Sequence, residues 1–154
     1  MENDEAVMRA SVAPNWPAAR LILSQGFNAA KDSGKHPIAN GMRSTAVNGA
    51  LDEFRIYTER RATAITLAVR LYAADHGGTL PARLGDLKPV YLSQIPVDPF
   101  APDERELRYI LSPRPVVYSI SENGIDDGGD DTGAAETNIW AFLDAVFPLA
   151  PPGR

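Results

Sequence analysis

Residues 48–76 read N-G-A-L-D-E-F-R-I-Y-T-E-R-R-A-T-A-I-T-L-A-V-R-L-Y-A-A-D-H, and this stretch decides the fold. Its apolar side chains recur at steps of three and four residues, so one face of a helix would be apolar. The recurring positions are Leu51, Phe54, Thr58, Ala62, Ile65, Ala68, Val69, Leu71 and Tyr72. No Pro or Gly interrupts the run from Ala50 to His76, and Gly77-Gly78 supplies a stop where a positive φ is needed. The pattern predicts a helix of about 27 residues, roughly 40 Å long.

The chain that follows the long helix is rich in proline. Seven of the 13 prolines fall between Pro81 and Pro115, which favours a pre-shaped covering loop over the interior of a sheet. Residues 82–87 form a short helix at most.

Short strands are predicted after this loop. Residues 107–111 and 116–120 contain Tyr and β-branched residues and are joined by Ser-Pro-Arg-Pro, which predicts an antiparallel hairpin. Residues 138–142 are the candidate for a third strand, although 138–147 also fit a helix. We therefore expect an α+β fold, with the long amphipathic helix packed on a small three-stranded antiparallel sheet under a Pro-rich covering loop.

The chain before the long helix shows weaker signals. Asn15-Trp16-Pro17 is typical of a helix start, because Asn caps free amides and Pro has no N–H to lose. A short helix over 18–24, ended by Gly26, is expected. The composition of 27–48 favours a linker or surface loop, although 42–47 could begin helical structure. The predicted organisation is an N-terminal arm (1–48), an α+β domain (49–147) and a Pro-rich tail (148–154).

Composition excludes several classes of protein. At 154 residues with 44% hydrophobic and 23% charged residues, the chain suits one globular domain rather than a disordered segment. Without cysteines it has no disulfide, thiolate metal site or Cys nucleophile. No apolar run approaches the roughly 18 residues of a membrane span, and residues 1–5 lack the basic start of a signal peptide.

The acidity of the chain is local. The formal charge of −5 comes from 20 acidic and 15 basic residues, and six of the acids lie between Glu122 and Glu136 without any Lys or Arg. The remaining 14 acids nearly balance the 15 bases, and no basic face points to nucleic-acid binding. Repulsion within the acidic segment favours a bound cation.

The residues suited to hold a cation lie in the loop after the second strand. Calcium prefers six to eight hard oxygen ligands, which carboxylates, amide carbonyls and backbone carbonyls in a glycine-containing loop can supply. The candidate ligands are Asn123, Asp126, Asp127, Asp130 and Asp131. In EF-hand register this loop starts with Ser119 and has strand-like flanks, which argues against an EF-hand. A solvated acidic turn without a bound ion stays open as the alternative.

Six blocks of sequence occur in an order known from one protein family. They are R-L-Y-A-A-D-H-G-G-T-L-P (70–81), L-G-D-L (84–87), Y-L-S-Q-I-P-V-D-P-F (91–100), L-R-Y (107–109), Y-S-I-S-E-N-G (118–124) and D-D-G-G-D-D (126–131). This succession resembles the C-terminal domain of the major pseudopilin of type II secretion systems, and the pseudopilin-like domains of bacterial surface proteins. The resemblance covers residues 62–142.

The resemblance implies a non-enzymatic structural or assembly domain in a bacterial secretion or cell-surface system. It implies a calcium ion in the acidic loop, protein partners with self-assembly into a pilus-like filament as one form, and a periplasmic or extracellular location. The family's processed leader and hydrophobic anchoring helix are not in this chain, and residues 1–48 match nothing in the family. The chain is therefore expected to be either a fragment that lacks its anchor or a domain reused in another protein.

Two other functions stay open from the residues alone. A partner- or ligand-binding module of a surface protein, with the Pro-rich loop as its contact surface, needs no ion in the acidic loop. Metal-assisted hydrolysis would require open coordination positions beside a cleft, and no histidine or base accompanies the aspartates in sequence. His76 is expected to serve the negative end of the long helix rather than catalysis.

Overall fold

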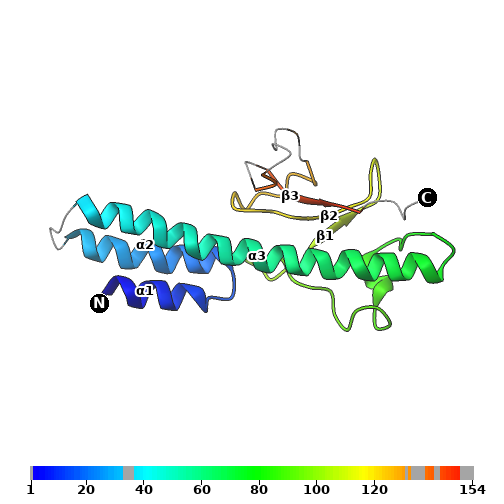
Figure 1. The fold of residues 1–154 in the computed structure, drawn as a ribbon, viewed down its shortest axis with the longest axis horizontal. Helices are drawn as coiled ribbons and strands as arrows, with labels where there is room; N and C mark the ends of the chain where they lie inside the picture. The colour runs from blue at the N-terminus through cyan, green and yellow to red at the C-terminus, as the bar shows by residue number, and fades with distance from the viewer. Residues whose placement is uncertain (1, 33–36, 131, 133–137, 141–142, 150–154) are drawn as a thin grey trace.

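The computed structural model describes residues 2–32, 37–130, 132, 138–140 and 143–149, and over these the chain is an α+β protein (Figure 1). The elements are α1 (Glu2–Ser11), α2 (Trp16–Asp32), α3 (Pro37–Asp75), a 3₁₀ helix η1 (Leu84–Leu87), β1 (Arg108–Ile110), β2 (Val116–Ser119) and β3 (Ala145–Pro148). The predicted α+β class and the small three-stranded antiparallel sheet are confirmed.

Helix α3 contains the helix that the apolar stripe predicts between residues 48 and 76, and it ends at Asp75. It ends where the glycine pair predicts, because the amide of Gly78 donates to the carbonyl of Ala73 at 2.7 Å while Gly77 and Gly78 adopt φ values of 62° and 89°. The ring of His76 stacks on that of Tyr72 at this end, with centroids 3.9 Å apart.

The expected linker over residues 27–48 is wrong in its secondary structure. Helix α2 continues to Asp32, and α3 already begins at Pro37. Glycines within helices cost only about 1 kcal/mol each, so tertiary packing overrides them. How the chain divides into domains stays a prediction.

The sheet has the strand order β1-β2-β3, and both pairs are antiparallel. Tyr109 pairs with Val117 in the predicted hairpin, and Val117 pairs with Phe147 on the other side. The third strand is therefore present at 145–148, not at the predicted 138–142. A short apolar run has no periodicity that separates a strand from its neighbours, and Pro148 is tolerated at the end of this edge strand.

Two hydrophobic clusters lie along α3. The first surrounds Leu51 and Phe54 and contains Trp16 and Leu23 of α2 together with Phe100. The second surrounds Ile65 and Val69 and contains side chains of η1, the covering loop and β2. In Figure 1, α1 and α2 accordingly lie along the N-terminal half of α3, whereas the sheet lies along its C-terminal half.

The start of α2 agrees with its prediction, but its end does not. The amide of Ala18 donates to Oδ1 of Asn15 at 3.0 Å, as expected of a helix cap. Gly26, the predicted stop, lies inside α2 facing α1, and a Cβ built there would be 2.5 Å from the Cβ of Ala6. Gly26 thus allows two helices to approach closely.

Two glycine substitutions test this packing. Gly49 also lies inside a helix but has no atom within 4 Å of a built Cβ, so Gly49→Ala is expected to stabilise the protein by about 0.5–1 kcal/mol. Gly26→Ala gains the same helix propensity but overpacks the contact with Ala6, for a net loss of about 1 kcal/mol. Urea denaturation measures both values, and equal effects would contradict the close approach of α1 and α2.

Candidate functional site

The acidic loop begins directly after β2 and folds back over the β1–β2 hairpin. Gly129 lies against this hairpin, because a Cβ there would be 3.1 Å from side-chain atoms of both Ile110 and Tyr118. Its φ of 75° also disfavours any other residue. The loop is therefore held on a surface built by the hairpin.

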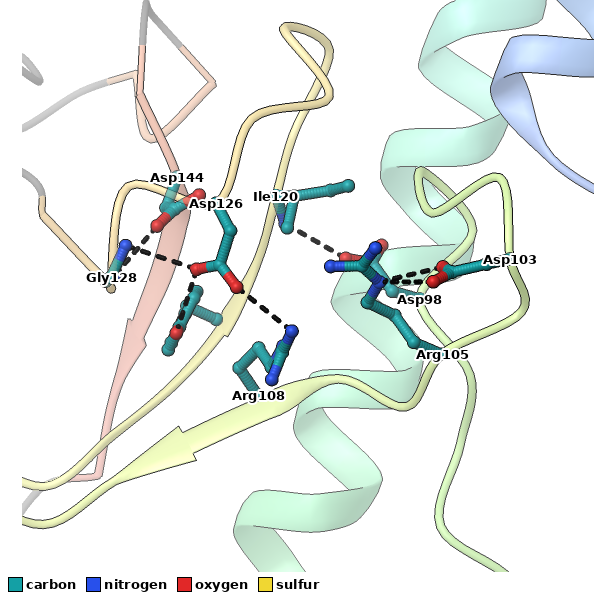
Figure 2. Close-up of polar contacts among 10 residues, drawn as sticks. Asp98, Asp103, Arg105, Arg108, Ile120, Asp126, Gly128 and Asp144 are labelled. Atoms are coloured by element: carbon teal, nitrogen blue, oxygen red, sulfur yellow. Dashed lines mark hydrogen bonds and ion pairs between the residues drawn. The ribbon is translucent and has the colours of Figure 1, made fainter.

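Figure 2 shows the contacts of Asp126, one of the loop's predicted ligands. Its Oδ2 is 3.0 Å from Nη2 of Arg108, and its Oδ1 accepts hydrogen bonds from the hydroxyl of Tyr118 and the amide of Gly128, both at 3.2 Å. Burial, together with the charge of Asp126, raises the pKa of Tyr118 to about 12. Protein groups therefore already provide this carboxylate with a cation and two donors.

Asp144 belongs to the site although it was not among the residues predicted from the sequence. It lies just before β3 and is 1% exposed, with Oδ2 accepting from the amide of Gly129 at 2.7 Å. Among the described residues, no donor meets hydrogen-bond geometry with its buried Oδ1, although the backbone amide of Asp127 is near enough to the carboxyl group to lower its pKa. Burial raises its pKa to about 6, against the lowering effect of donated hydrogen bonds, and the charges of Asp126 and Asp127 add to the rise. The sequence signal that could have identified Asp144 is its position as an acid inside the apolar run F-L-D-A-V-F (142–147).

The other predicted ligands separate into two places. Nδ2 of Asn123 donates to Oδ2 of Asp127 at 3.0 Å, so these two residues are together. Asp130 instead accepts from the amide of Thr132 at 2.8 Å, a contact that lowers the pKa of its carboxyl group. Asp131 lies outside the described residues. Within the described part of the chain, no three His, Asp or Glu side chains are grouped so that they could hold a metal ion.

A second buried carboxylate connects the covering loop to the end of β2. Asp98 is 2% exposed, and its Oδ1 accepts from the hydroxyl of Ser119 at 2.7 Å and from the amide of Phe100 at 2.9 Å. Its Oδ2 accepts from the amide of Ile120 at 2.9 Å. Desolvation raises the pKa of Asp98 despite these three donors. In the sequence, Asp98 stands within the block 91–100, where no pattern indicated this role.

The start of the loop is also tied to α3. Glu122 forms an ion pair with Arg55, whose guanidinium carbon lies 5.7 Å from the ring centroid of Trp140. The indole nitrogen of Trp140 donates to Glu59 at 3.3 Å. Because Trp140 lies beside the Arg55–Glu122 ion pair, its fluorescence should respond to changes in the conformation of the loop.

The raised pKa of Asp144 predicts a pH-dependent stability. Its folded pKa of about 6 lies above the ordinary value of 3.8, so the folded state retains a proton that the unfolded state loses, and stability falls as pH rises from about 4 to about 6. Without divalent cations, we expect this fall to be about 2 kcal/mol, somewhat less than the full pKa difference allows. Asp144→Asn should remove most of it. Urea titrations across this pH range check the prediction, and an unchanged slope in the variant would contradict it.

Comparison of the chain with protein-family models, curated proteins and solved structures finds no match. The resemblance to pseudopilins therefore stays a prediction. Among the described residues, no helix combines the length and the apolarity that crossing a membrane requires.

Proposed function

We propose that this protein is a non-enzymatic, pseudopilin-like structural or assembly domain of a bacterial secretion or cell-surface system. In this proposal a calcium ion orders the acidic loop, the domain works outside the cytoplasm, and its partners are proteins, including further copies of the chain. The α+β architecture supports it, because the C-terminal half of a long helix packs on a small three-stranded antiparallel sheet, as a pseudopilin-like fold requires.

The observation that carries the calcium part of the proposal is the orphaned oxygen of Asp144. A carboxylate oxygen buried without a donor costs about 1–3 kcal/mol or more, so such groups call for an explanation. Carboxylate oxygens are good ligands for a hard cation such as calcium. The loop that covers Asp144 contains further carboxylates, and their charges already raise the pKa of Asp144.

In this proposal Asp144, Asp126 and Asp127 would move closer together to hold the cation, because no three acidic side chains of the described residues are grouped for a metal ion as they stand. Asn123 and Asp130 remain candidate ligands, and Asp131 completes the set drawn from the sequence. When bound, calcium would supply the positive charge that the loop lacks. By binding the same ion, the ligand residues would hold the loop against the hairpin. The free energy of calcium binding would then stabilise the fold. Arg108 would have to share Asp126 with the ion or move aside.

A calcium titration tests this proposal. At a hundredfold excess over Kd a ligand stabilises by about 2.7 kcal/mol, which raises the Tm of a chain of this size by about 5–10 °C. Asp144→Asn and Asp126→Asn should each lose the rise. Asp103→Asn should keep it, because Asp103 lies outside the loop and pairs with Arg105 at 2.7 Å. An equal melting curve in calcium and in chelator, at matched ionic strength, would reject a calcium site.

The contacts of Asp126 favour a second candidate function. Arg108 and Tyr118 already satisfy this carboxylate, as a loop without an ion would require. Beside the loop lies a cavity of about 430 Å³ between it and α2, with a largely apolar wall that includes Trp16, Leu21 and Phe100. A partner- or ligand-binding module of a surface protein would use such a surface. A folded chain without any calcium response favours this candidate.

A further inference from the structure

Three Asn–Gly dipeptides occur in the sequence, and the structure places them differently. Asn40–Gly41 and Asn48–Gly49 lie inside α3, where helical hydrogen bonds hold the backbone amides. Asn123–Gly124 lies in the turn that opens the acidic loop, and both residues are exposed. Among the described residues, the amide of Gly124 makes a long backbone contact, 3.4 Å to the carbonyl of Ser121.

An Asn–Gly pair can modify itself when its backbone is free to adjust. The backbone nitrogen of glycine attacks Cγ of asparagine, and a bond from nitrogen to Cγ forms while the nitrogen loses its proton. The side-chain nitrogen leaves as ammonia with that proton, which gives a five-membered succinimide ring. Water then opens the ring to aspartate or isoaspartate. Glycine favours the reaction because it has no side chain to obstruct the ring.

The contacts of Asn123 match what this reaction needs. Oδ1 of Asn123 accepts from the amide of Ile125 at 2.9 Å, and this donor stabilises the negative charge that the attack places on that oxygen. Nδ2 donates to the carboxylate of Asp127 at 3.0 Å. A carboxylate at the leaving nitrogen can carry the proton to the departing ammonia.

We propose that Asn123–Gly124 is a site of spontaneous deamidation in the folded protein, with Asp127 as the residue that carries the proton. The product places one more carboxylate in the acidic loop, beside Glu122 and Asp127. Where isoaspartate forms, the main chain also lengthens by one carbon at the point where the loop leaves β2. The modification depends only on the turn and its hydrogen bonds, so it does not require the calcium site.

The experiment incubates the full chain in chelator at mildly alkaline pH and follows each Asn–Gly pair by mass spectrometry of proteolytic peptides. In the folded protein we expect Asn123 to react at least about tenfold faster than Asn48, since ~1.4 kcal/mol of helix opening suffices for that ratio. In concentrated urea the difference should disappear. An Asn123 rate no higher than that of Asn48 in the folded chain would overturn the proposal.

Two variants separate the roles of the residues. Asn123→Gln should suppress modification at this position, because the corresponding ring has six members and closes slowly. Asp127→Ala removes the carboxylate without creating a further Asn–Gly pair, and it should slow the reaction of Asn123 in the folded chain and leave it unchanged in urea. If Asn123 in Asp127→Ala reacts as fast as in the original chain or faster, the contact with Nδ2 merely holds the side chain, and the assignment of Asp127 fails. The far-UV spectrum of each variant confirms that the comparison is between folded proteins.

Discussion

Phe100→Ala is expected to lower the free energy of unfolding by about 3–5 kcal/mol, the range for removing a fully buried aromatic ring. Phe100 is 0% exposed, and its ring centroid lies 6.5 Å from that of Trp16, 6.5 Å from that of Phe54 and 5.5 Å from that of Trp140. Its removal leaves a cavity where α2, α3 and the covering loop meet. Because the chain has only these two tryptophans, the emission spectrum should change as well.

Val90→Ala is the matched control for this prediction. Val90 belongs to the same covering loop but is 76% exposed, so its truncation should change stability by no more than about 0.5 kcal/mol. Urea denaturation followed by tryptophan fluorescence measures both variants. A loss below about 1.5 kcal/mol for Phe100→Ala would mean that the cluster is not packed as described.

Asp98→Ala is expected to cost about 3 kcal/mol. The substitution leaves the amides of Phe100 and Ile120 and the hydroxyl of Ser119 buried without their acceptor, and each such loss costs about 1–3 kcal/mol. The raised pKa of Asp98 indicates that burying its charge is itself unfavourable, so the net loss lies below the sum.

Asp98→Asn preserves the shape of the side chain and one acceptor oxygen. The new amide group faces either the donor of Ile120 or the two donors of Ser119 and Phe100, so we expect an intermediate loss of about 1–2 kcal/mol. Unfolding in urea at neutral pH ranks the variants. Equal stability of Asp98→Ala and the original chain would show that these donors find other acceptors.

The parts of the fold that follow from local chemistry were predictable from the sequence. The stripe from Leu51 to Tyr72 and the stop at Gly77 and Gly78 predicted the C-terminal part of α3, because both depend on residues that are neighbours in sequence. The hairpin around Pro113 and Pro115 was predicted for the same reason. Asn15 indicated the start of α2 through its capping side chain.

The parts that depend on distant residues were not predictable. The low helix propensity of Gly26 predicted a helix end there. In the structure Gly26 lies inside α2, where only a residue without a side chain leaves room for Ala6 of α1. Strand β3 was placed too early, since only its pairing with β2 distinguishes it from the residues before it. Asp144 could not be predicted as a site residue, because it is buried by a loop whose nearest contact, Gly129, is 15 residues away in the sequence.

The sequence indicated which loop forms the candidate site, but it did not indicate which residues contact one another within that site. The ion pair between Arg108 and Asp126 links residues that no spacing rule connects. Asp130 and Asp127 have similar surroundings in sequence but different hydrogen-bond partners in the fold. The resemblance to pseudopilins spans residues 62–142, which include the end of α3, β1 and β2 but not β3, and it offers no account of α1 and α2.

The continuity of α3 has a mechanical consequence. One helix carries Phe54 in the first cluster and Val69 in the second, and no Gly or Pro lies between Ala50 and His76 to act as a hinge. A pull on the α1–α2 end therefore reaches the sheet as a displacement of a stiff rod rather than as the stretching of a linker. A force applied at one end of α3 would therefore be transmitted to the acidic loop through the ion pair between Arg55 and Glu122, which joins α3 to the loop.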